Sequence, residues 1–199
     1  CRSRGLGDVY KRQRVARAVD NQNSNEDERS FARISTAISK YWITKRAPYL
    51  VFEALECHGG PGYIEESIMP RLYREAPLNS IWEGSGNVMC LDVLRALQRD
   101  KNALPSLFKE LASAKGSNKN FDESFSHLKE TLQDPIDLEI EARLLTEKMA
   151  CLIQASIFIK SGEEEKISAF CNSRLGPRWS GAFGTLPTDT SFEYIMGGI

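Results

Sequence analysis

The fold class is decided by residues 29–63, RSFARISTAISKYWITKRAPYLVFEALECHGGPGY. Apolar side chains recur three and four residues apart along this stretch, which is the spacing of one face of a helix. They are Phe31, Ile34, Ala37, Ile38, Tyr41, Trp42, Leu50, Val51, Ala54 and Leu55. Pro48 must kink the helix or restart it, because proline lacks an amide donor and clashes with the preceding turn. The glycines at 59, 60 and 62 end the run, so we expect helix over residues 26–57 followed by a tight turn.

The remaining segments are predicted to be helical as well. We expect a short helix at 66–75, a loop at 76–86, and a strongly amphipathic helix at 87–99 in which Val88, Leu91, Leu94 and Leu97 share a face. Further helices are expected at 103–114, 121–132, 136–160 and 163–172, before an irregular tail at 175–190. No alternating strand pattern of useful length and no repeat is present. The sequence therefore predicts an all-α bundle.

The first thirteen residues, CRSRGLGDVYKRQ, have no helical or strand period. Their end, DVYKRQ, resembles the translation of an adaptor used in sequencing libraries, and such a segment must be excluded from reasoning about the fold. We expect residues 1–13 to be non-native and the chain to be the C-terminal piece of a longer protein. The alternative is a genuine basic N-terminal arm.

Composition excludes several classes of protein. The chain has 199 residues and a formal net charge of −1, so its charge gives no reason to expect a polyanion as partner. Five cysteines without a CxxC pair indicate reduced thiols and a cytoplasmic location. The apolar stretches are too short to span a membrane, which takes about 20 residues. His58 and His127 have no ligands at metal-binding spacing, so no metal site is expected.

Three motifs follow one another in a specific order. They are EALECHGGPGY at 53–63, PRLYREAP at 70–77 and NSIWEGSGN at 79–87. In this order they resemble the C-terminal helical domain of the flavin-dependent acyl-CoA dehydrogenases. Together with FCNSRL at 170–175 and AFGTLP at 182–187, the third motif resembles the AidB-like, alkylation-response branch of that family. The resemblance covers residues 14–199 and implies a dehydrogenase-type helical bundle at 14–100 and an additional helical extension at 101–199.

The resemblance also implies an activity, α,β-dehydrogenation of an acyl-CoA thioester with FAD as hydride acceptor. Glu83 stands at the position of the family's α-proton base, a role that needs a carboxylate in a dry site. Gly59 and Gly60 would lie against the flavin nucleotide of a neighbouring subunit in a homotetramer. Further cofactor contacts are expected at the following positions: Ile81, Trp82, Gly84, Ser85, Gly86 and Asn87. Without the resemblance, Glu83 is an acidic residue that complements a helix dipole.

Two other functions stay open. The first is association with DNA through the extension, for which Arg95 and Arg99, and more loosely Arg174 and Arg178, are the candidate contacts. Residues 91–199 contain 13 Lys and Arg against 16 Asp and Glu, whereas a DNA-binding face concentrates positive charge. The second is a structural role in subunit contacts. Because the family holds its flavin between three domains, we expect the chain alone neither to bind FAD tightly nor to turn over an acyl-CoA.

Overall fold

The computed structural model describes residues 2–133, 138–177, 179 and 181–197, and among these it contains helices and no strand. Its α-helices are α1 (Arg2–Asn21), α2 (Glu26–Cys57), α3 (Gly60–Tyr63), α4 (Met69–Glu75), α5 (Gly86–Arg99), α6 (Ala103–Ala112), α7 (Lys119–Gln133), α8 (Leu138–Ser161), α9 (Glu164–Arg174) and α10 (Phe192–Met196). A 3-10 helix, η1 (Ala76–Ser80), lies between α4 and α5. The prediction of an all-α fold is confirmed.

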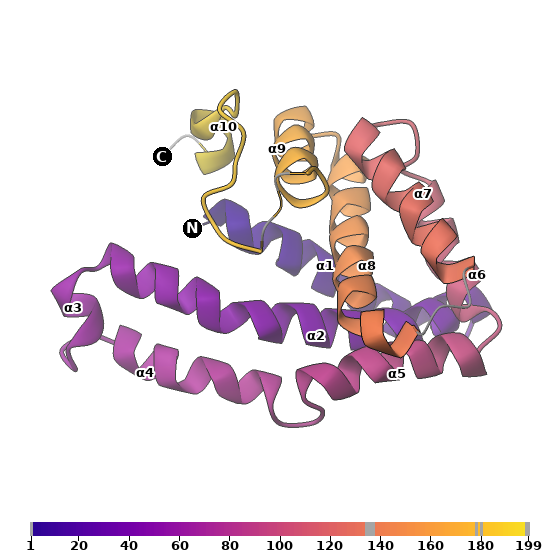
Figure 1. Cartoon of the computed structure of the whole chain (residues 1–199), viewed down its shortest axis with the longest axis horizontal. Helices are drawn as coiled ribbons and strands as arrows, with labels where there is room; N and C mark the ends of the chain where they lie inside the picture. Colours follow the sequence, from indigo (N-terminus) through magenta and orange to yellow (C-terminus); the bar gives the residue numbers. More distant parts are fainter. Residues whose placement is uncertain (1, 134–137, 178, 180, 198–199) are drawn as a thin grey trace.

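The long helix α2 is the axis of the molecule (Figure 1). Its first turn is capped by Asn25, whose side chain accepts a hydrogen bond from the amide of Glu28 at 3.2 Å. The helix continues through Pro48 to Cys57, so the proline does not restart it. The chain then turns at Gly59, whose φ is +62° and therefore suits glycine.

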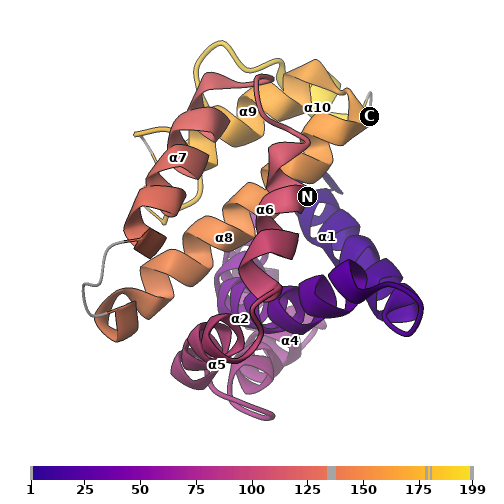
Figure 2. The same ribbon diagram turned by 90° about the vertical axis from the view of Figure 1, so that its right-hand side faces the viewer.

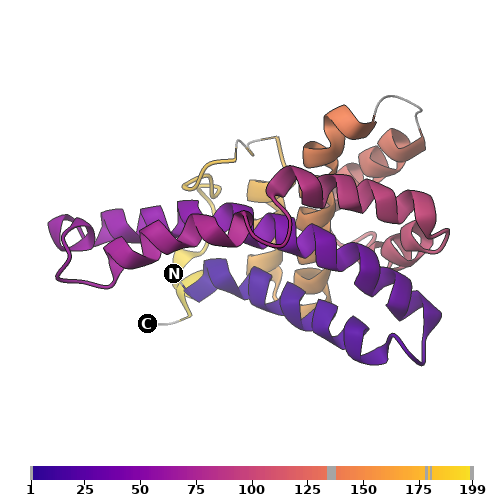
Figure 3. The ribbon, with the colours of Figure 1, turned by 90° about the horizontal axis from the view of Figure 1, so that it is seen from below.

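The other helices pack along or across α2. After the turn, α4, η1 and α5 run back along one side of α2, whereas α1 lies beside it on another side (Figures 1 and 3). On the remaining side α8 crosses α2, with α7 and α9 flanking α8 (Figure 2). The C-terminal half of α2 therefore projects with α3 and α4 as a two-helix arm.

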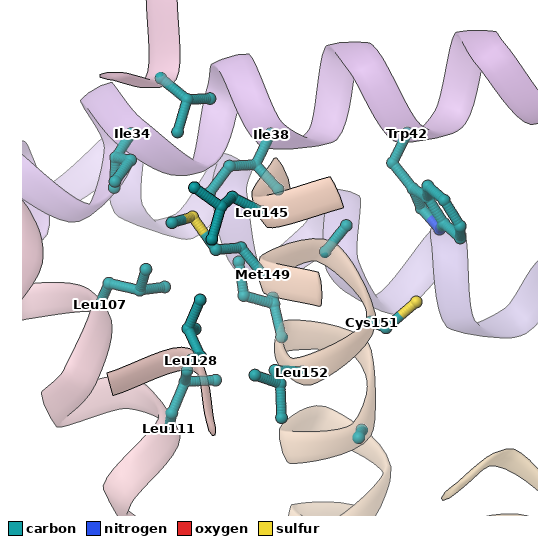
Figure 4. Packing of buried hydrophobic residues seen from close by; sticks show 14 of the residues in the cluster. Ile34, Ile38, Trp42, Leu107, Leu111, Leu128, Leu145, Met149, Cys151 and Leu152 are labelled. Carbon is teal, nitrogen blue, oxygen red and sulfur yellow. The ribbon is translucent and has the colours of Figure 1, made fainter. Parts of the chain in front are cut away.

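One hydrophobic core joins the predicted bundle to the predicted extension. Ile34 and Ile38 of α2 meet Leu145 and Met149 of α8, and all four are at most 1% exposed (Figure 4). Leucines of α6, α7 and α8 complete the core on the far side of this contact: Leu107, Leu111, Leu128 and Leu152. Burial of side chains of this size contributes about 1.5–3 kcal/mol each. The boundary at residue 100 stays a prediction, and the core is continuous across it.

The structure corrects the sequence prediction at three places. Helix α1 includes residues 2–13, for which no helix was expected, because contacts with α2 and α8 stabilise a helix whose own apolar period is weak. The expected loop at 76–86 contains η1, and α10 was not predicted. The other expected helices are present with ends shifted by up to three residues, and positions 136 and 137 lie outside the described residues.

A network of charged side chains joins α1, α2, α6 and α8. Arg14 of α1 donates to Glu110 of α6 at 2.9 and 3.0 Å and to both carboxylate oxygens of Glu28 at 2.8 Å. Lys160 of α8 also donates to Glu110, whose side chain is 9% exposed. Burial by itself would raise the pKa of Glu110, but the hydrogen bonds from Arg14 and Lys160 outweigh it and lower that pKa below its ordinary value of 4.5.

We predict that Glu110→Gln lowers the free energy of unfolding by about 1–3 kcal/mol near neutral pH, because Arg14 and Lys160 lose a charged acceptor. Since the folded-state pKa of Glu110 is depressed, its contribution is complete above the ordinary glutamate range and is lost as the pH falls through the folded-state value. Urea unfolding between neutral and acidic pH measures this. The difference from wild type should shrink on acidification, and the exposed Glu165→Gln serves as control. A constant difference at all pH values would contradict the prediction.

Candidate functional site

The loop between η1 and α5 presents Glu83 with an unusual backbone. Glu83 has φ +53°, and among the described residues it is the one non-glycine residue with positive φ. The next residue, Gly84, has φ +111°. A non-glycine residue in this region costs on the order of 1–3 kcal/mol and persists only where the surroundings impose it. The backbone is therefore strained at Glu83, the residue predicted to be the catalytic base.

Lys40 of α2 imposes this conformation on the loop. Its ammonium group donates hydrogen bonds to the carbonyl oxygens of Asn79 at 2.7 Å, Trp82 at 3.0 Å and Gly84 at 3.2 Å. All three donors of the ammonium are thereby used on one short segment. Sequence reasoning missed Lys40, since a lysine on the polar side of a helix gives no local signal for a loop some forty residues later.

The side chain of Glu83 is exposed. Ile81 and Trp82 beside it are 63% and 57% exposed. The expectation of a dry site is therefore not met by this chain alone.

The glycines of the loop have packing roles in this chain. A Cβ on Gly84 would lie 2.6 Å from Sδ of Met89, in addition to the strain of its positive φ. Gly86 is buried, and a Cβ there would meet the ring of Tyr41 at 3.5 Å. The first turn of α5 thus lies close to α2 at Gly86, at a distance that is an ordinary van der Waals contact.

Two of the expected cofactor contacts, Ser85 and Asn87, lie at the start of α5 and differ in their hydrogen bonding. Ser85 is the N-cap residue, is exposed, and makes no capping hydrogen bond with its side chain. Asn87 accepts a hydrogen bond at 2.7 Å from Nε of Arg143 on α8. The amides at a helix N-terminus and a free hydroxyl suit an anionic or hydroxyl-bearing ligand, whereas Oδ1 of Asn87 already has a partner.

The glycine turn follows the C-terminal end of α2, whereas Lys40 lies near the middle of that helix. Seventeen residues separate Lys40 from Cys57, which at 1.5 Å per residue is about 25 Å. Gly59 and Gly60 are exposed, and a Cβ on either would meet nothing within 4 Å. Gly62 is the crowded member, since a Cβ would lie 2.2 Å from the carbonyl oxygen of Leu55. The structure does not bring the turn and the Glu83 loop together within one chain.

The candidate nucleic-acid residues do not gather on one surface. Arg95 donates to Asp92 at 3.2 Å, and Asp92 also holds Arg33 at 2.8 and 2.9 Å. Arg99 is exposed at the end of α5, whereas Arg174 belongs to α9 on the opposite side of the molecule (Figures 1 and 2). Arg178 lies outside the described residues.

The described residues hold neither a metal-binding cluster nor a helix suited to a bilayer. In the part of the chain that the structure describes, no group of three or more His, Cys, Asp or Glu side chains is placed to hold a metal ion. None of the helices described is both long and apolar enough to cross a bilayer. Cys57, Cys90, Cys151 and Cys171 are free thiols.

The two-helix arm, η1 and the loop that follows η1 expose many large apolar side chains. We call this set the apolar arm, and it consists of Tyr49, Phe52, Tyr63, Ile64, Ile68, Leu72, Tyr73, Leu78, Ile81 and Trp82, each at least 40% exposed. Exposed apolar residues gathered on neighbouring segments in this way are typical of interaction surfaces.

Comparison with known proteins identifies similar chains. Residues 9–98 match the family model described as "Acyl-CoA dehydrogenase, C-terminal domain". The chain is 39% identical over 165 residues to "Putative acyl-CoA dehydrogenase AidB" of Escherichia coli, which is 83% of this chain and 30% of that protein. It is 35% identical over 113 residues to "Acyl-CoA dehydrogenase family member 11" of Caenorhabditis elegans, covering 57% of this chain and 18% of that one.

Two solved structures have a similar fold. The crystal structure of Caenorhabditis elegans ACDH-11 in complex with C11-CoA matches with a TM-score of 0.76 at 24% identity, over 87% of this chain and 35% of that one. The structure described as "Bd2924 apo-form" matches with a TM-score of 0.67 at 29% identity, over 78% of this chain and 31% of that one. The chain thus spans about a third of these proteins or less.

We predict that Lys40→Met loosens the Glu83 loop. The loss of three hydrogen bonds from a charged donor should speed amide hydrogen exchange in residues 79–85 at least about tenfold, measured by mass spectrometry. Lys101→Met, which removes an exposed lysine outside the loop, is the control. Unchanged exchange in the Lys40 variant would show that the loop conformation does not depend on this contact.

Proposed function

Because the chain belongs to the acyl-CoA dehydrogenase family, with that family's C-terminal domain matched at residues 9–98, we propose that it is the part of an FAD-dependent dehydrogenase that carries the catalytic base, Glu83. The reaction is α,β-dehydrogenation of an acyl-CoA thioester. Glu83 takes the proton from the carbon next to the thioester carbonyl. FAD, when bound, accepts the hydride from the neighbouring carbon.

The observation that carries this proposal is the strained backbone of Glu83 in a loop held by Lys40. A surface glutamate without a function has no need of positive φ, and the strain is offset here by three hydrogen bonds from one ammonium group. The loop fixes where the carboxylate stands relative to the first turn of α5. Such positioning is what proton abstraction requires, because the base must reach one hydrogen of a bound substrate.

The residues around Glu83 fit a flavin and an acyl thioester. Ile81 and Trp82 offer exposed apolar surface, and Ser85 offers a hydroxyl at a helix N-terminus. Main-chain amides in this loop are candidates to stabilise the charge that develops on the thioester oxygen. Since Glu83 is exposed in this chain, water must be excluded by the bound ligands and by segments of the enzyme outside it.

We also propose that the full-length enzyme is a homotetramer. Lys40, which holds the Glu83 loop, lies about 25 Å along α2 from Cys57, where the glycine turn begins, and this separation supports a role for the two sites in different copies of the active site. Gly59 and Gly60 would then meet the flavin nucleotide of a neighbouring subunit. The apolar arm is the surface that such an assembly would bury.

DNA association in an alkylation response is the second candidate, and the observations favour it less. Arg95 is paired with Asp92, which lowers its local positive charge. Arg99 alone makes a small basic surface, whereas a DNA-binding face contacts several phosphates.

A cytoplasmic location is part of the main proposal, in keeping with the four free thiols.

We predict that Glu83→Gln slows bleaching of the bound flavin by acyl-CoA at least about hundredfold in the full-length enzyme, because a carboxamide cannot take the α-proton. The measurement is anaerobic absorbance with a panel of acyl-CoAs. The exposed Glu66→Gln is the matched control and should bleach like wild type. Wild-type enzyme that binds flavin but is bleached by no acyl-CoA would overturn the proposed activity.

A further inference from the structure

A cavity of about 300 Å³ lies between α2, α8, α9 and the C-terminal segment. Its walls include Leu50 of α2, the segment 183–186 and Ile195 of α10. In Figure 1, α9 and α10 lie on one side of α2, and α4 and α5 on the other. None of the residues 79–85 of the Glu83 loop is among the described residues that line it. The cavity is therefore separate from the candidate dehydrogenase site.

Aromatic and aliphatic side chains form most of the wall. Four aromatic rings line the cavity, those of Trp42, Phe158, Phe170 and Phe183. The ring centroids of Phe158 on α8 and Phe170 on α9 are 5.2 Å apart, and the two ring planes are tilted by 47°. Tilted rings present both faces and edges to the space between the helices, and an aromatic molecule packs well against both.

The polar side chains of the wall already bind other groups of the protein. Nε1 of Trp42 donates to Oε1 of Gln154 at 3.0 Å. The hydroxyl of Ser173 donates at 2.6 Å to a carbonyl oxygen of its own helix, and Lys166 is paired with Glu163. A molecule in the cavity therefore does not need to supply hydrogen-bonding groups, because the buried polar atoms are satisfied without it.

The two arginines of the wall are also engaged within the protein. The guanidinium carbon of Arg46 is 4.8 Å from the ring centroid of Phe183. Nη1 of Arg174 donates to Oγ1 of Thr185 at 3.1 Å. Both guanidinium groups lie over the ring of Trp179, at 5.3 Å for Arg46 and 4.5 Å for Arg174.

A carboxylate lies beside these two positive charges. The indole nitrogen of Trp179, which both guanidinium groups contact, donates to Oε1 of Glu147 on α8. A bound anion would meet this carboxylate and would compete with the existing partners of the arginines. A bound cation would meet the arginines themselves. Since either ion would also lose hydration, the surroundings favour a ligand without charge.

We propose that this cavity binds a neutral apolar molecule of the size of two fused aromatic rings. A cavity of about 150 Å³ takes one benzene molecule, so a volume twice as large has room for a second ring. The aromatic walls supply the contacts, and the release of water from apolar surface supplies the driving force. This proposal does not depend on the proposed dehydrogenase activity, because it uses no residue of the Glu83 loop.

The test is calorimetric titration of the purified chain with 2-naphthol, which is uncharged at neutral pH. The anion 2-naphthoate and the cation 2-naphthylmethylammonium carry the same two rings and are titrated beside it. We expect saturable binding of 2-naphthol and at least about tenfold weaker binding of both ions, because their charged groups lose hydration in the cavity. Added salt should leave the affinity for 2-naphthol unchanged, because no ion pair forms.

A substitution that fills the cavity tests the location. Ala169 lines the cavity from α9 and is 6% exposed. Ala169→Phe places a ring in the space that the ligand would occupy, and we expect it to weaken 2-naphthol binding at least about tenfold. Ala112→Phe, at an exposed position at the end of α6, is the matched control and should bind like wild type.

Three results would overturn the proposal. They are the absence of saturable 2-naphthol binding, equal affinity for 2-naphthol and either ion, and a folded Ala169→Phe variant that binds 2-naphthol like wild type. Circular dichroism establishes whether the variant is folded. If it unfolds, the comparison of the three ligands on the wild-type chain decides, since it needs no substitution.

Discussion

Burial of the apolar face of α2 against α8 is the contact on which the rest of the structure depends. Ile34 and Ile38 meet Leu145 and Met149 in a region without access to water. This contact fixes how α2 is rotated about its own axis. The rotation in turn directs Lys40 towards the carbonyl oxygens of the Glu83 loop, so the core contact also orients the candidate site.

The sequence predicts the helices well because each is encoded by neighbours three and four residues apart. The amphipathic segment at 87–99 became α5 almost residue for residue. The same reasoning failed at residues 2–13, where contacts with other helices stabilise α1, and at η1, where the turn is too short to show a period. A spacing of three and four between apolar residues identifies a helix that has one buried face. It does not identify a helix such as α1, whose own spacing is weak and which is stabilised mainly by contacts with other helices.

The candidate site could be named from the sequence only through the order of three motifs, which singles out Glu83 and the glycines. Its physical construction depends on residues far apart in the chain. Lys40 meets the carbonyl oxygens of Asn79, Trp82 and Gly84, about forty residues later in the chain. Every residue type has the same main-chain carbonyl group, so the sequence could not indicate that Lys40 binds the carbonyl oxygens of this loop.

The hydrogen bond from Arg143 to Asn87 makes the extension a structural neighbour of the Glu83 loop. Asn87 lies in the first turn of α5, four residues after Glu83, while Arg143 comes from α8, in the part of the chain predicted to be the extension. The two parts are therefore not interchangeable modules. A chimera that exchanged residues 101–199 between relatives would have to re-form both this hydrogen bond and the core contact between α2 and α8.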